Sequence, residues 1–403
     1  MSMSDVIVVG GGPAGSCTAW ALAQAGVAVT IVDRAHFPRD KPCAEYLSPQ
    51  ASRILHAMGV LDTVEQAGGA ELAGMIVRAP SGDRILGEFA AAHGFRGFRD
   101  RGLALRRRVL DTILIDRARQ SGANVIEGAR VSDIERNAHG RVVGVRTDGG
   151  LHRARIVVGA DGLRSVVARR LGLARSRSWP RRLAFVTHYA GVADIGPHGE
   201  MHVERDGYIG LADVGGGVTN VALVVPASRA RTVGADRNGF LERWIAGRPA
   251  LAPRFAHARR EGEVRATGPF AAHARRAWAP GAALVGDAAE FFDPFTGEGI
   301  YAALRGGELL APFLVEALAA PHDRSADAAL ARYESARRRE FAGKWRVEKL
   351  VGGAVASPLL MNHAARVLSR RRDLADLLVG VTGDFVPPRE VLRPSYILSL
   401  LFA

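Results

Sequence analysis

Three glycines near the amino terminus have the spacing that lets a backbone bind a diphosphate. Gly10, Gly12 and Gly15 form the pattern G-x-G-x-x-G, and Asp33 follows at the distance typical of nucleotide sites. The first glycine allows a tight turn, the second lets a pyrophosphate approach the backbone, and the third lets a helix pack closely on a strand. The pattern predicts a dinucleotide site rather than a purely structural turn. An acid at position 33 favours a free ribose 2′-hydroxyl, so FAD or NAD fits better than NADP.

A second junction with glycines and an acid lies far downstream. Asp287 follows the apolar run 282–285, and Gly297 and Gly299 precede a long apolar segment. The two glycines let a ligand approach the backbone, and a helix that begins there directs its free N–H groups at negative charge. Asp287 is placed to hydrogen-bond a polyol hydroxyl. One extended dinucleotide held between the two junctions is the simplest interpretation.

Cys43 and three arginines are further candidates for chemistry. Cys43 lies in a polar, proline-containing loop from residue 34 to residue 49, and loops of this length are usually functional. Three roles are open for its thiol: packing beside a cofactor, acting as a redox-active or proton-donating group, or no special role. Arg106, Arg107 and Arg108 precede a predicted helix. They form a solvated face, or one of them reaches the phosphates of the nucleotide.

Side chains on later predicted strands are candidates for contact with a substrate. His188 and His202 are interpreted as structural histidines or as substrate contacts. Tyr189 and Tyr208 are candidates for orienting a phenolic or ketone group.

The elements that must position these residues are visible as apolar patterns. Apolar runs predict buried strands at 6–9, 27–32, 156–158 and 282–285, and other segments predict helices at 14–25, 109–121 and 300–319. Period-two patterns at 183–225, with shorter runs at 70–105, predict a mostly antiparallel second sheet that forms the wall of a substrate pocket. Residues 328–403 are predicted to be helical and rich in arginine.

The composition indicates a soluble globular protein with a high positive charge. Of the 403 residues, 48% are hydrophobic and 24% are charged. Only three of the 54 basic residues are lysines, and the formal net charge is +13. This arginine bias reflects a GC-rich coding sequence or an attraction to anionic cofactors, lipid surfaces or acidic substrates. No basic tract interleaved with aromatic residues occurs, so we do not expect nucleic acid as a partner.

Cysteine content and hydropathy bear on the location of the protein. Two cysteines provide neither a disulfide framework nor a metal-binding spacing, which indicates a reducing compartment and no metal site. Gly10 interrupts the first apolar run, so we expect no signal peptide, and no apolar run is long enough to predict a membrane span. We therefore expect a cytoplasmic protein. Its carboxyl-terminal part packs over the nucleotide domain or forms a basic amphipathic patch that docks on a membrane.

Three motifs together resemble those of a known family. The first glycine turn with Asp33, Gly-Ala-Asp-Gly at 159–162 and Gly-Asp-Ala-Ala at 286–289 resemble, in that order, FAD-dependent monooxygenases of the para-hydroxybenzoate hydroxylase type. Phe-Pro-Arg-Asp-Lys-Pro-Cys at 37–43 and Asp-Pro-Phe-Thr-Gly-Glu-Gly at 293–299 resemble more narrowly its geranylgeranyl reductase branch. The resemblance covers roughly residues 5 to 320 and is specific for FAD rather than for a substrate.

The resemblance implies an α/β fold. An FAD-binding, Rossmann-like domain of the glutathione-reductase type would carry an inserted, mostly antiparallel substrate domain and a helical carboxyl-terminal region. The expected limits are 1–75, 103–175 and 272–325 for the FAD-binding domain, 76–102 and 176–271 for the substrate domain, and 326–403 for the helical region.

The resemblance also implies which residues contact the cofactor. In such enzymes the first glycine turn binds the pyrophosphate, and Asp33 binds the adenosine ribose. Cys43 and Gly299 lie beside the flavin ring, and Asp161 is associated with cofactor and reduced-nicotinamide use. The full set implied for cofactor binding is Gly10, Gly12, Pro13, Ala14, Gly15, Asp33, Arg34, Cys43, Ala44, Arg107, Val131, Asp161, Gly286, Asp287, Gly297, Gly299 and Ile300.

Two reactions on FAD and one role without turnover remain open. The first hypothesis is a monooxygenase that uses NAD(P)H and O₂, through a flavin hydroperoxide, to hydroxylate or epoxidise an apolar or aromatic small molecule. The second is a reductase or dehydrogenase of an alkene-containing, prenyl-like substrate. The sequence differs from the reductase branch at Ala44 and Tyr46 and in the segment Tyr208–Asp213, which ranks this hypothesis second. The third is a flavin-binding scaffold without turnover.

Overall fold

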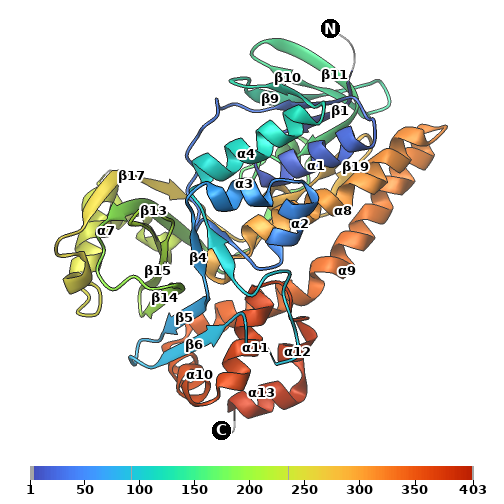
Figure 1. The fold of residues 1–403 in the computed structure, drawn as a ribbon. Helices are drawn as coiled ribbons and strands as arrows, with labels where there is room; N and C mark the ends of the chain where they lie inside the picture. Colours follow the sequence, from blue (N-terminus) through green and yellow to red (C-terminus); the bar gives the residue numbers. More distant parts are fainter. Residues whose placement is uncertain (1–3, 92, 235, 402–403) are drawn as a thin grey trace.

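The computed structural model describes residues 4–91, 93–234 and 236–401, which fold into three connected regions (Figure 1). A sheet with flanking helices lies at the upper right of the view, a second sheet lies at the left, and the carboxyl-terminal helices lie at the bottom. The long helix α9 (Asp323–Ala356) runs from the first region to the third.

The first sheet has eight strands and is parallel at its centre. Its main path is β19-β20-β11-β1-β2-β8, and β10 and β9 extend it as antiparallel strands from β11. The strands are β1 (Ser4–Val9), β2 (Val29–Val32), β8 (Asn124–Ile126), β9 (Val131–Arg136), β10 (Val142–Thr147), β11 (Gly150–Gly159), β19 (Trp278–Ala279) and β20 (Ala282–Leu284). Helix α1 (Pro13–Gln24) contacts both α4 (Arg107–Gln120) and α8 (Gly299–Ala319).

The first turn requires glycine at two positions. Gly10 has a φ of +104°, and a Cβ there would lie 2.5 Å from the carbonyl oxygen of Ala160. A Cβ on Gly15 would lie 1.8 Å from the carbonyl oxygen of Gly10. Both distances are too short for a side chain, so the two glycines let β1, α1 and the end of β11 meet.

Helices α1 and α8 pack with their backbones close together. A Cβ on Gly307 of α8 would lie 3.0 Å from the carbonyl oxygen of Ala14 and from the amide nitrogen of Thr18, both on α1. The helices that follow the two predicted junctions are therefore neighbours, although the junctions are far apart in the sequence.

The second sheet has seven strands in the order β17-β13-β16-β15-β14-β5-β6. All neighbours are antiparallel except β14 and β5, which are parallel. The strands are β5 (Gly74–Arg78), β6 (Arg84–Glu88), β13 (Arg182–Ala190), β14 (His198–Glu204), β15 (Gly207–Asp213), β16 (Val218–Pro226) and β17 (Arg259–Thr267).

Alternation of side chains gives the second sheet two buried faces. Phe185 and Leu223 pack on one face beneath α7 (Arg237–Ala246), whereas Val186 and Val224 point to the other face. That second face looks toward the first region and the carboxyl-terminal helices.

Shorter elements connect the two large sheets. One small sheet contains β3 (Tyr46–Leu47), β4 (Ala70–Leu72) and β7 (Gly102–Ala104), and another contains β12 (Ala174–Ser176), β18 (Ala272–Ala274) and β21 (Glu290–Phe291). The remaining helices of this part are α2 (Ala51–Ala57), α3 (Leu61–Gln66), α5 (Val166–Arg170) and α6 (Ala230–Val233).

The carboxyl-terminal helices pack on both large regions. Helix α9 packs against α8 and β19, as expected of a segment that covers the nucleotide domain. Helices α10 (Pro358–Arg370) and α11 (Arg372–Thr382) pack instead on β6, the edge strand of the second sheet. The chain ends with α12 (Arg389–Leu392) and α13 (Pro394–Leu401).

The expected fold class is confirmed: an α/β region of dinucleotide-binding type, a mostly antiparallel sheet and a helical carboxyl-terminal region are all present. The expected domain limits stay a prediction, although β5 crosses the limit placed between residues 75 and 76. β9 was not predicted, because it alternates charged and apolar residues on a partly exposed hairpin.

Candidate functional site

A large cavity lies between the first region and the inner face of the second sheet. Its empty volume, open mouth included, is ≈ 1190 Å³. Among the residues predicted to bind the cofactor, those that line it are Gly12, Pro13, Ala14, Cys43, Ala44, Arg107, Asp287, Gly297, Gly299 and Ile300. Both predicted junctions therefore contribute to one cavity.

Two guanidinium groups converge beside the first glycine turn. A Cβ on Gly12 would lie 3.6 Å from Nη2 of Arg39 and 3.8 Å from Nη2 of Arg107, with no protein atom nearer. Arg107 donates to Asp111 through Nε at 2.7 Å and Nη2 at 2.8 Å, and Arg39 Nη1 lies 2.9 Å from the same carboxylate. Burial alone would lower the pKa of Arg107, but Asp111 outweighs it and raises that pKa above its usual value. The space over Gly12 is thus open and faces two fixed positive charges.

Lys41 adds a third cation to the same end of the cavity. Its Nζ lies 3.6 Å from the position of a Cβ on Gly162, in the second of the three motifs. Burial, together with the neighbouring Arg107, lowers the pKa of the Lys41 ammonium, while Asp287 and Asp111 oppose that shift. An anion between the three cations would relieve their mutual repulsion.

The second junction lies directly against the first. Gly286 has a φ of +61°, and a Cβ there would lie 3.0 Å from Cβ of Ala14. Asp287 lines the same cavity as Arg107, together with Gly299 and Ile300 at the start of α8. The start of α8 therefore faces the cavity.

Asp33 is buried next to the first turn and holds it in place. Its Oδ2 accepts a hydrogen bond from the amide of Gly11 at 2.7 Å, and its Oδ1 accepts one from the amide of Ala35 at 2.8 Å. Each carboxylate oxygen keeps a further lone pair, so both can also accept from ribose hydroxyls.

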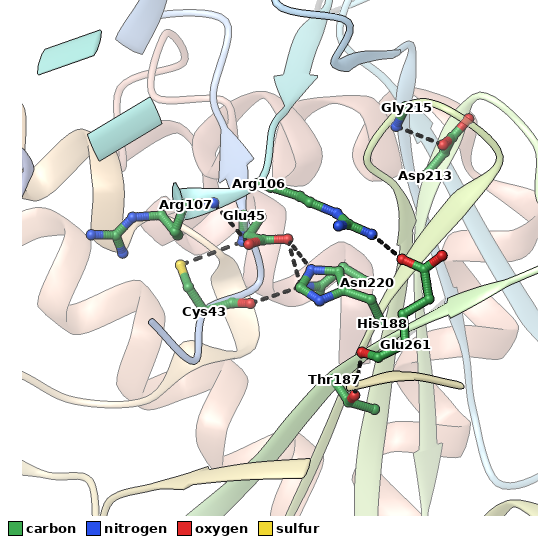
Figure 2. A network of polar contacts seen from close by, with 10 residues as sticks. All are labelled: Cys43, Glu45, Arg106, Arg107, Thr187, His188, Asp213, Gly215, Asn220 and Glu261. Carbon is green, nitrogen blue, oxygen red and sulfur yellow. Dashed lines mark hydrogen bonds and ion pairs between the residues drawn. The ribbon is translucent and has the colours of Figure 1, made fainter. Parts of the chain in front are cut away.

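Glu45 is the centre of a polar network on the cavity wall (Figure 2). It is buried and has a φ of +61°, a conformation uncommon for residues other than glycine. Its Oε1 accepts from the amide of Arg107 at 2.8 Å, and its Oε2 lies 2.7 Å from Nε2 of His188 and 3.0 Å from Nδ2 of Asn220. One carboxylate thus joins the loop that carries Cys43, the start of α4 and two strands of the second sheet.

The two cysteines have different surroundings. Cys43 lines the cavity, its Sγ accepts from the amide of Glu45 at 3.4 Å, and its carbonyl oxygen accepts from Asn220 at 2.9 Å. Cys17 is fully buried on α1 and donates to the carbonyl oxygen of Leu304, and burial raises the pKa of its thiol to about 12. Of the two, only Cys43 can meet a ligand.

The sheet side of the cavity is apolar. Val186, Met201, Ala222 and Val224 project there from β13, β14 and β16. A second, almost wholly apolar space reaches Met75 on β5 and shares the wall residues Ala44, Tyr46, Met201 and Gly210 with the first. The two spaces lie next to each other along the sheet, and both have mainly apolar walls.

Tyr208 lines the cavity, but its hydroxyl is already bound. It donates to Oδ1 of Asp293 at 2.6 Å, and Arg182 binds the other oxygen of that carboxylate at 2.8 Å. Burial and Asp293 raise the pKa of Tyr208 well above its usual value. Tyr208 therefore presents the face of its ring, and its hydroxyl is not available to orient a substrate.

The other predicted substrate residues do not line the cavity. His188 is bound to Glu45, and His202 points to the opposite side of β14 from Met201, where it meets Glu200. Tyr189 packs against Phe255 on the outer face of the sheet.

Several residues implied for cofactor binding lie outside the cavity wall. Gly10 and Gly15 shape the turn, Gly286 contacts Ala14, and Asp33 supports the turn from behind, as described above. Arg34 is exposed, and Val131 is buried in the core of the first region at the start of β9. Asp161 Oδ2 accepts from the amides of Val166 and Val167 at 2.6 and 3.3 Å, which places it at the start of α5.

The pair of Glu200 and His202 gives a testable stability prediction. Burial alone would raise the pKa of Glu200, but hydrogen bonds from His202 at 2.7 Å and from Arg254 at 2.6 and 2.9 Å lower it to about 2. The folded-state pKa lies below the unfolded value, so this stabilisation is present above pH 4.5 and is lost as the pH falls through 2. We expect Glu200→Gln to reduce the free energy of unfolding by about 2 kcal/mol at neutral pH.

The thermal midpoint of Glu200→Gln, measured from neutral to acid pH, tests this prediction. Its deficit relative to the unsubstituted protein should shrink as the pH falls toward 2. Glu204→Gln, on the same strand and partly exposed, is the control and should show no such trend. A deficit of the same size at every pH would contradict the assignment.

Sequence reasoning missed residues that the fold brings to the site. Arg39, Lys41 and Glu45 all lie in the proline-containing loop whose length indicated a function, but nothing marked them individually. Asn220 had no local signal, because only the pairing of β13 with β16 places it beside His188.

Neither a metal cluster nor a membrane span is found in the described part of the chain. No group of histidine, cysteine and acidic side chains there is arranged to hold a metal ion. No helix among residues 4–91, 93–234 and 236–401 is both long and apolar enough to cross a bilayer.

Comparison with known proteins identifies relatives along nearly the whole chain. The model of the family described as "FAD binding domain" matches residues 3–347. Digeranylgeranylglycerophospholipid reductase 2 of Methanopyrus kandleri is 32% identical over 95% of this chain and 93% of that protein. Ubiquinone hydroxylase UbiL of Rhodospirillum rubrum is 30% identical over 83% of this chain and 78% of that protein.

A solved structure has the same architecture. The myxobacterial chondrochloren halogenase CndH superposes with a TM-score of 0.79 at 26% identity, over 86% of this chain and 82% of that one. The relatives therefore share a fold and a cofactor-binding region, while their names record a reduction, a hydroxylation and a halogenation.

Proposed function

This chain belongs to the FAD binding domain family, and from that membership we propose that it is an FAD-dependent reductase of carbon–carbon double bonds in an elongated, isoprenoid-type lipid. Membership of the family makes it an FAD-dependent oxidoreductase. The reduction, the lipid and the use of NAD(P)H as electron donor are the proposal.

The residues present fit FAD. The open space over Gly12 faces Arg39 and Arg107, as an anionic pyrophosphate requires. Asp33 would accept hydrogen bonds from the adenosine ribose, and Asp287 from the ribityl hydroxyls. Ala44 and Gly299 leave room on the cavity wall for a flat ring.

The observation that carries the proposal is the pair of adjacent apolar spaces along the second sheet, which would together form the substrate channel. Its wall is made of Val186, Met201, Ala222, Val224 and neighbouring apolar residues. The hydroxyl of Tyr208, which lines the cavity, is bound to Asp293 and is therefore not available to a phenolate or a carboxylate. A long hydrocarbon chain, by contrast, would bury its surface against the whole wall.

Reduction of a double bond requires a hydride on one carbon and a proton on the other. Bound reduced FAD would supply the hydride. The Cys43 thiol, on the cavity wall beside the Arg107 guanidinium, would donate the proton and recover it from solvent. The apolar wall excludes water and holds the double bond between the two donors.

Monooxygenation, which the sequence ranked first, is kept as the second candidate, because the ubiquinone hydroxylase named above matches most of this chain. The same apolar wall would also exclude water from an oxygen-dependent reaction. The two reactions differ in their need for O₂, which makes them separable by one experiment.

The test is an anaerobic incubation of the FAD-loaded protein with NADH or NADPH and digeranylgeranylglycerophospholipid dispersed in detergent. Mass spectrometry should show a gain of two hydrogens per double bond, and in D₂O at least one of the two should be deuterium. Product that forms only with O₂ and contains one added oxygen would replace this proposal with monooxygenation. Absence of turnover both with and without O₂ would favour a flavin-binding scaffold.

Cys43→Ser tests the proton donor. Serine is a far weaker acid, so the rate of reduction should fall by about 100-fold while the FAD absorbance band is unchanged. Cys17→Ser, the same exchange away from the cavity, should leave the rate close to that of the unsubstituted protein. Equal rates for Cys43→Ser and Cys17→Ser would remove Cys43 from the mechanism.

A further inference from the structure

Large apolar side chains are exposed at one end of the molecule, where α9, α10 and α13 end or begin. Elsewhere in the described residues the only exposed large apolar side chains are Phe98 and Trp179, and Trp179 lies 3.9 Å from the position of a Cβ on Gly352 of α9. The exposed large apolar residues at this end are Leu350, Leu359, Leu360, Ile397, Leu398 and Leu401, and we name these six the C-terminal apolar patch.

The members of the patch come together through contacts between the helices. Only Ser357 separates α9 from α10, and His363 Nε2 on α10 donates to the carbonyl oxygen of Leu400 on α13 at 2.8 Å. Leu359 and Leu360 lie one helical turn before His363, so they adjoin the end of α13. Figure 1 shows α10 and α13 side by side at the end of the molecule away from the amino terminus.

Exposed cations flank the patch. Arg346 and Lys349 lie within one turn of Leu350 on α9, and Arg366 and Arg370 follow Leu359 and His363 along one face of α10. None of the four forms an ion pair within the part of the chain that the structure describes. Apolar side chains bordered by unpaired cations match the surface of a bilayer that contains anionic lipids.

The helices that carry the patch also pack against the wall of the proposed substrate channel. One cluster of buried apolar residues contains Val186 and Met201 of the cavity wall together with Val355, Met361 and Tyr396 on the inner faces of α9, α10 and α13. The helices that expose the patch on one side therefore pack behind the channel on the other.

We propose that the C-terminal apolar patch and its flanking cations dock the protein on an anionic lipid bilayer, the phase in which its lipid substrate resides. The identity of the substrate rests on the proposed function. The identity of the partner, a lipid bilayer, rests on the exposed surface itself. A bilayer is the occupant that meets both the exposed leucines and the unpaired cations at once.

Co-sedimentation of the FAD-loaded protein with vesicles tests the docking. The protein should bind phosphatidylcholine vesicles that contain phosphatidylglycerol at least about tenfold more tightly than vesicles of phosphatidylcholine alone. Leu359→Asp with Leu398→Asp, at positions 83% and 52% exposed, should weaken binding by about tenfold or more. Arg366→Glu with Arg370→Glu should remove the preference for phosphatidylglycerol.

Matched controls make the result specific. Phe98→Asp, at an exposed apolar residue outside the patch, and Arg205→Glu, at an exposed arginine in the β14–β15 turn, should bind vesicles as the unsubstituted protein does. Equal loss in the controls, or no binding of the unsubstituted protein, would overturn the proposal. So would a dimer of the chain that the patch variants dissociate, because a second copy would then cover the surface.

The failure of this proposal differs from the failure of the proposed function. Patch variants should still reduce a short, water-soluble prenyl alcohol, because the patch residues do not line the cavity. Reduction of that alcohol without vesicle binding would overturn the docking alone. Vesicle binding without any reduction would overturn the reaction alone.

Discussion

Gly12→Glu is expected to abolish FAD binding and to leave the fold intact. The substituted side chain meets no protein atom closer than 3.6 Å at its Cβ, so the turn can accommodate it. Its carboxylate would occupy the space over the turn and pair with Arg39 and Arg107, which are then not available to a pyrophosphate. We expect the dissociation constant for FAD to rise by at least about 100-fold, which corresponds to a loss of about 2.7 kcal/mol.

Titration of the apoprotein with FAD, followed by flavin fluorescence, measures this effect, and circular dichroism checks the fold. Gly196→Glu is the matched control, because Gly196 is exposed, has no atom within 4 Å of its Cβ position and lies away from the cavity. A yellow, fully loaded Gly12→Glu protein would show that the pyrophosphate does not pass over this turn.

Asp111→Asn is expected to cause the largest loss of stability in the apoprotein. Asp111 is fully buried and neutralises both Arg39 and Arg107. Removing its charge leaves two buried or partly buried cations close together, which should lower the free energy of unfolding by about 3–5 kcal/mol. Bound FAD should restore part of this loss, because its two phosphate charges would lie against the same guanidinium groups.

Thermal unfolding with and without FAD measures both parts of this prediction. The increase in midpoint caused by FAD should be larger for Asp111→Asn than for the unsubstituted protein. Asp116→Asn, on the same helix but exposed and paired with Arg119, should change neither the midpoint nor the response to FAD appreciably. An FAD response that is smaller in Asp111→Asn would place the phosphates away from the two arginines.

The sequence was most informative where a short stretch decides the geometry. The strand before Gly10, the turn and α1 are adjacent in the chain. The atoms that exclude a side chain at Gly15 belong to this stretch, and those that exclude one at Gly10 follow the end of β11. The apolar run at 282–285 and the helix after Gly299 were visible for the same reason. The alternating pattern at 183–225 likewise predicted the strands that form the apolar wall.

The polar part of the site depends on contacts between distant segments, so no local pattern revealed it. Glu45 acts through partners on α4, β13 and β16, and its positive φ is not encoded by its residue type. The sequence left both a structural and a substrate role open for His188. Only its pairing with Glu45, which no local pattern reveals, distinguishes the surroundings of this histidine from those of His202. The packing of α10 and α11 on β6 was missed because the edge strand precedes those helices by almost 300 residues.

The positions of the two large sheets along the chain have a consequence for the order in which it folds as it leaves the ribosome. The second sheet needs residues from 74 to 267, whereas the first sheet is complete only when β20 has emerged, and α1 has its neighbour only when α8 has followed. The inserted unit is therefore fully synthesised before the unit into which it is inserted. Until α8 has emerged, the nascent chain exposes the α1 surface around Ala14 and lacks the second junction of the cofactor site. We therefore expect FAD to bind late in biogenesis.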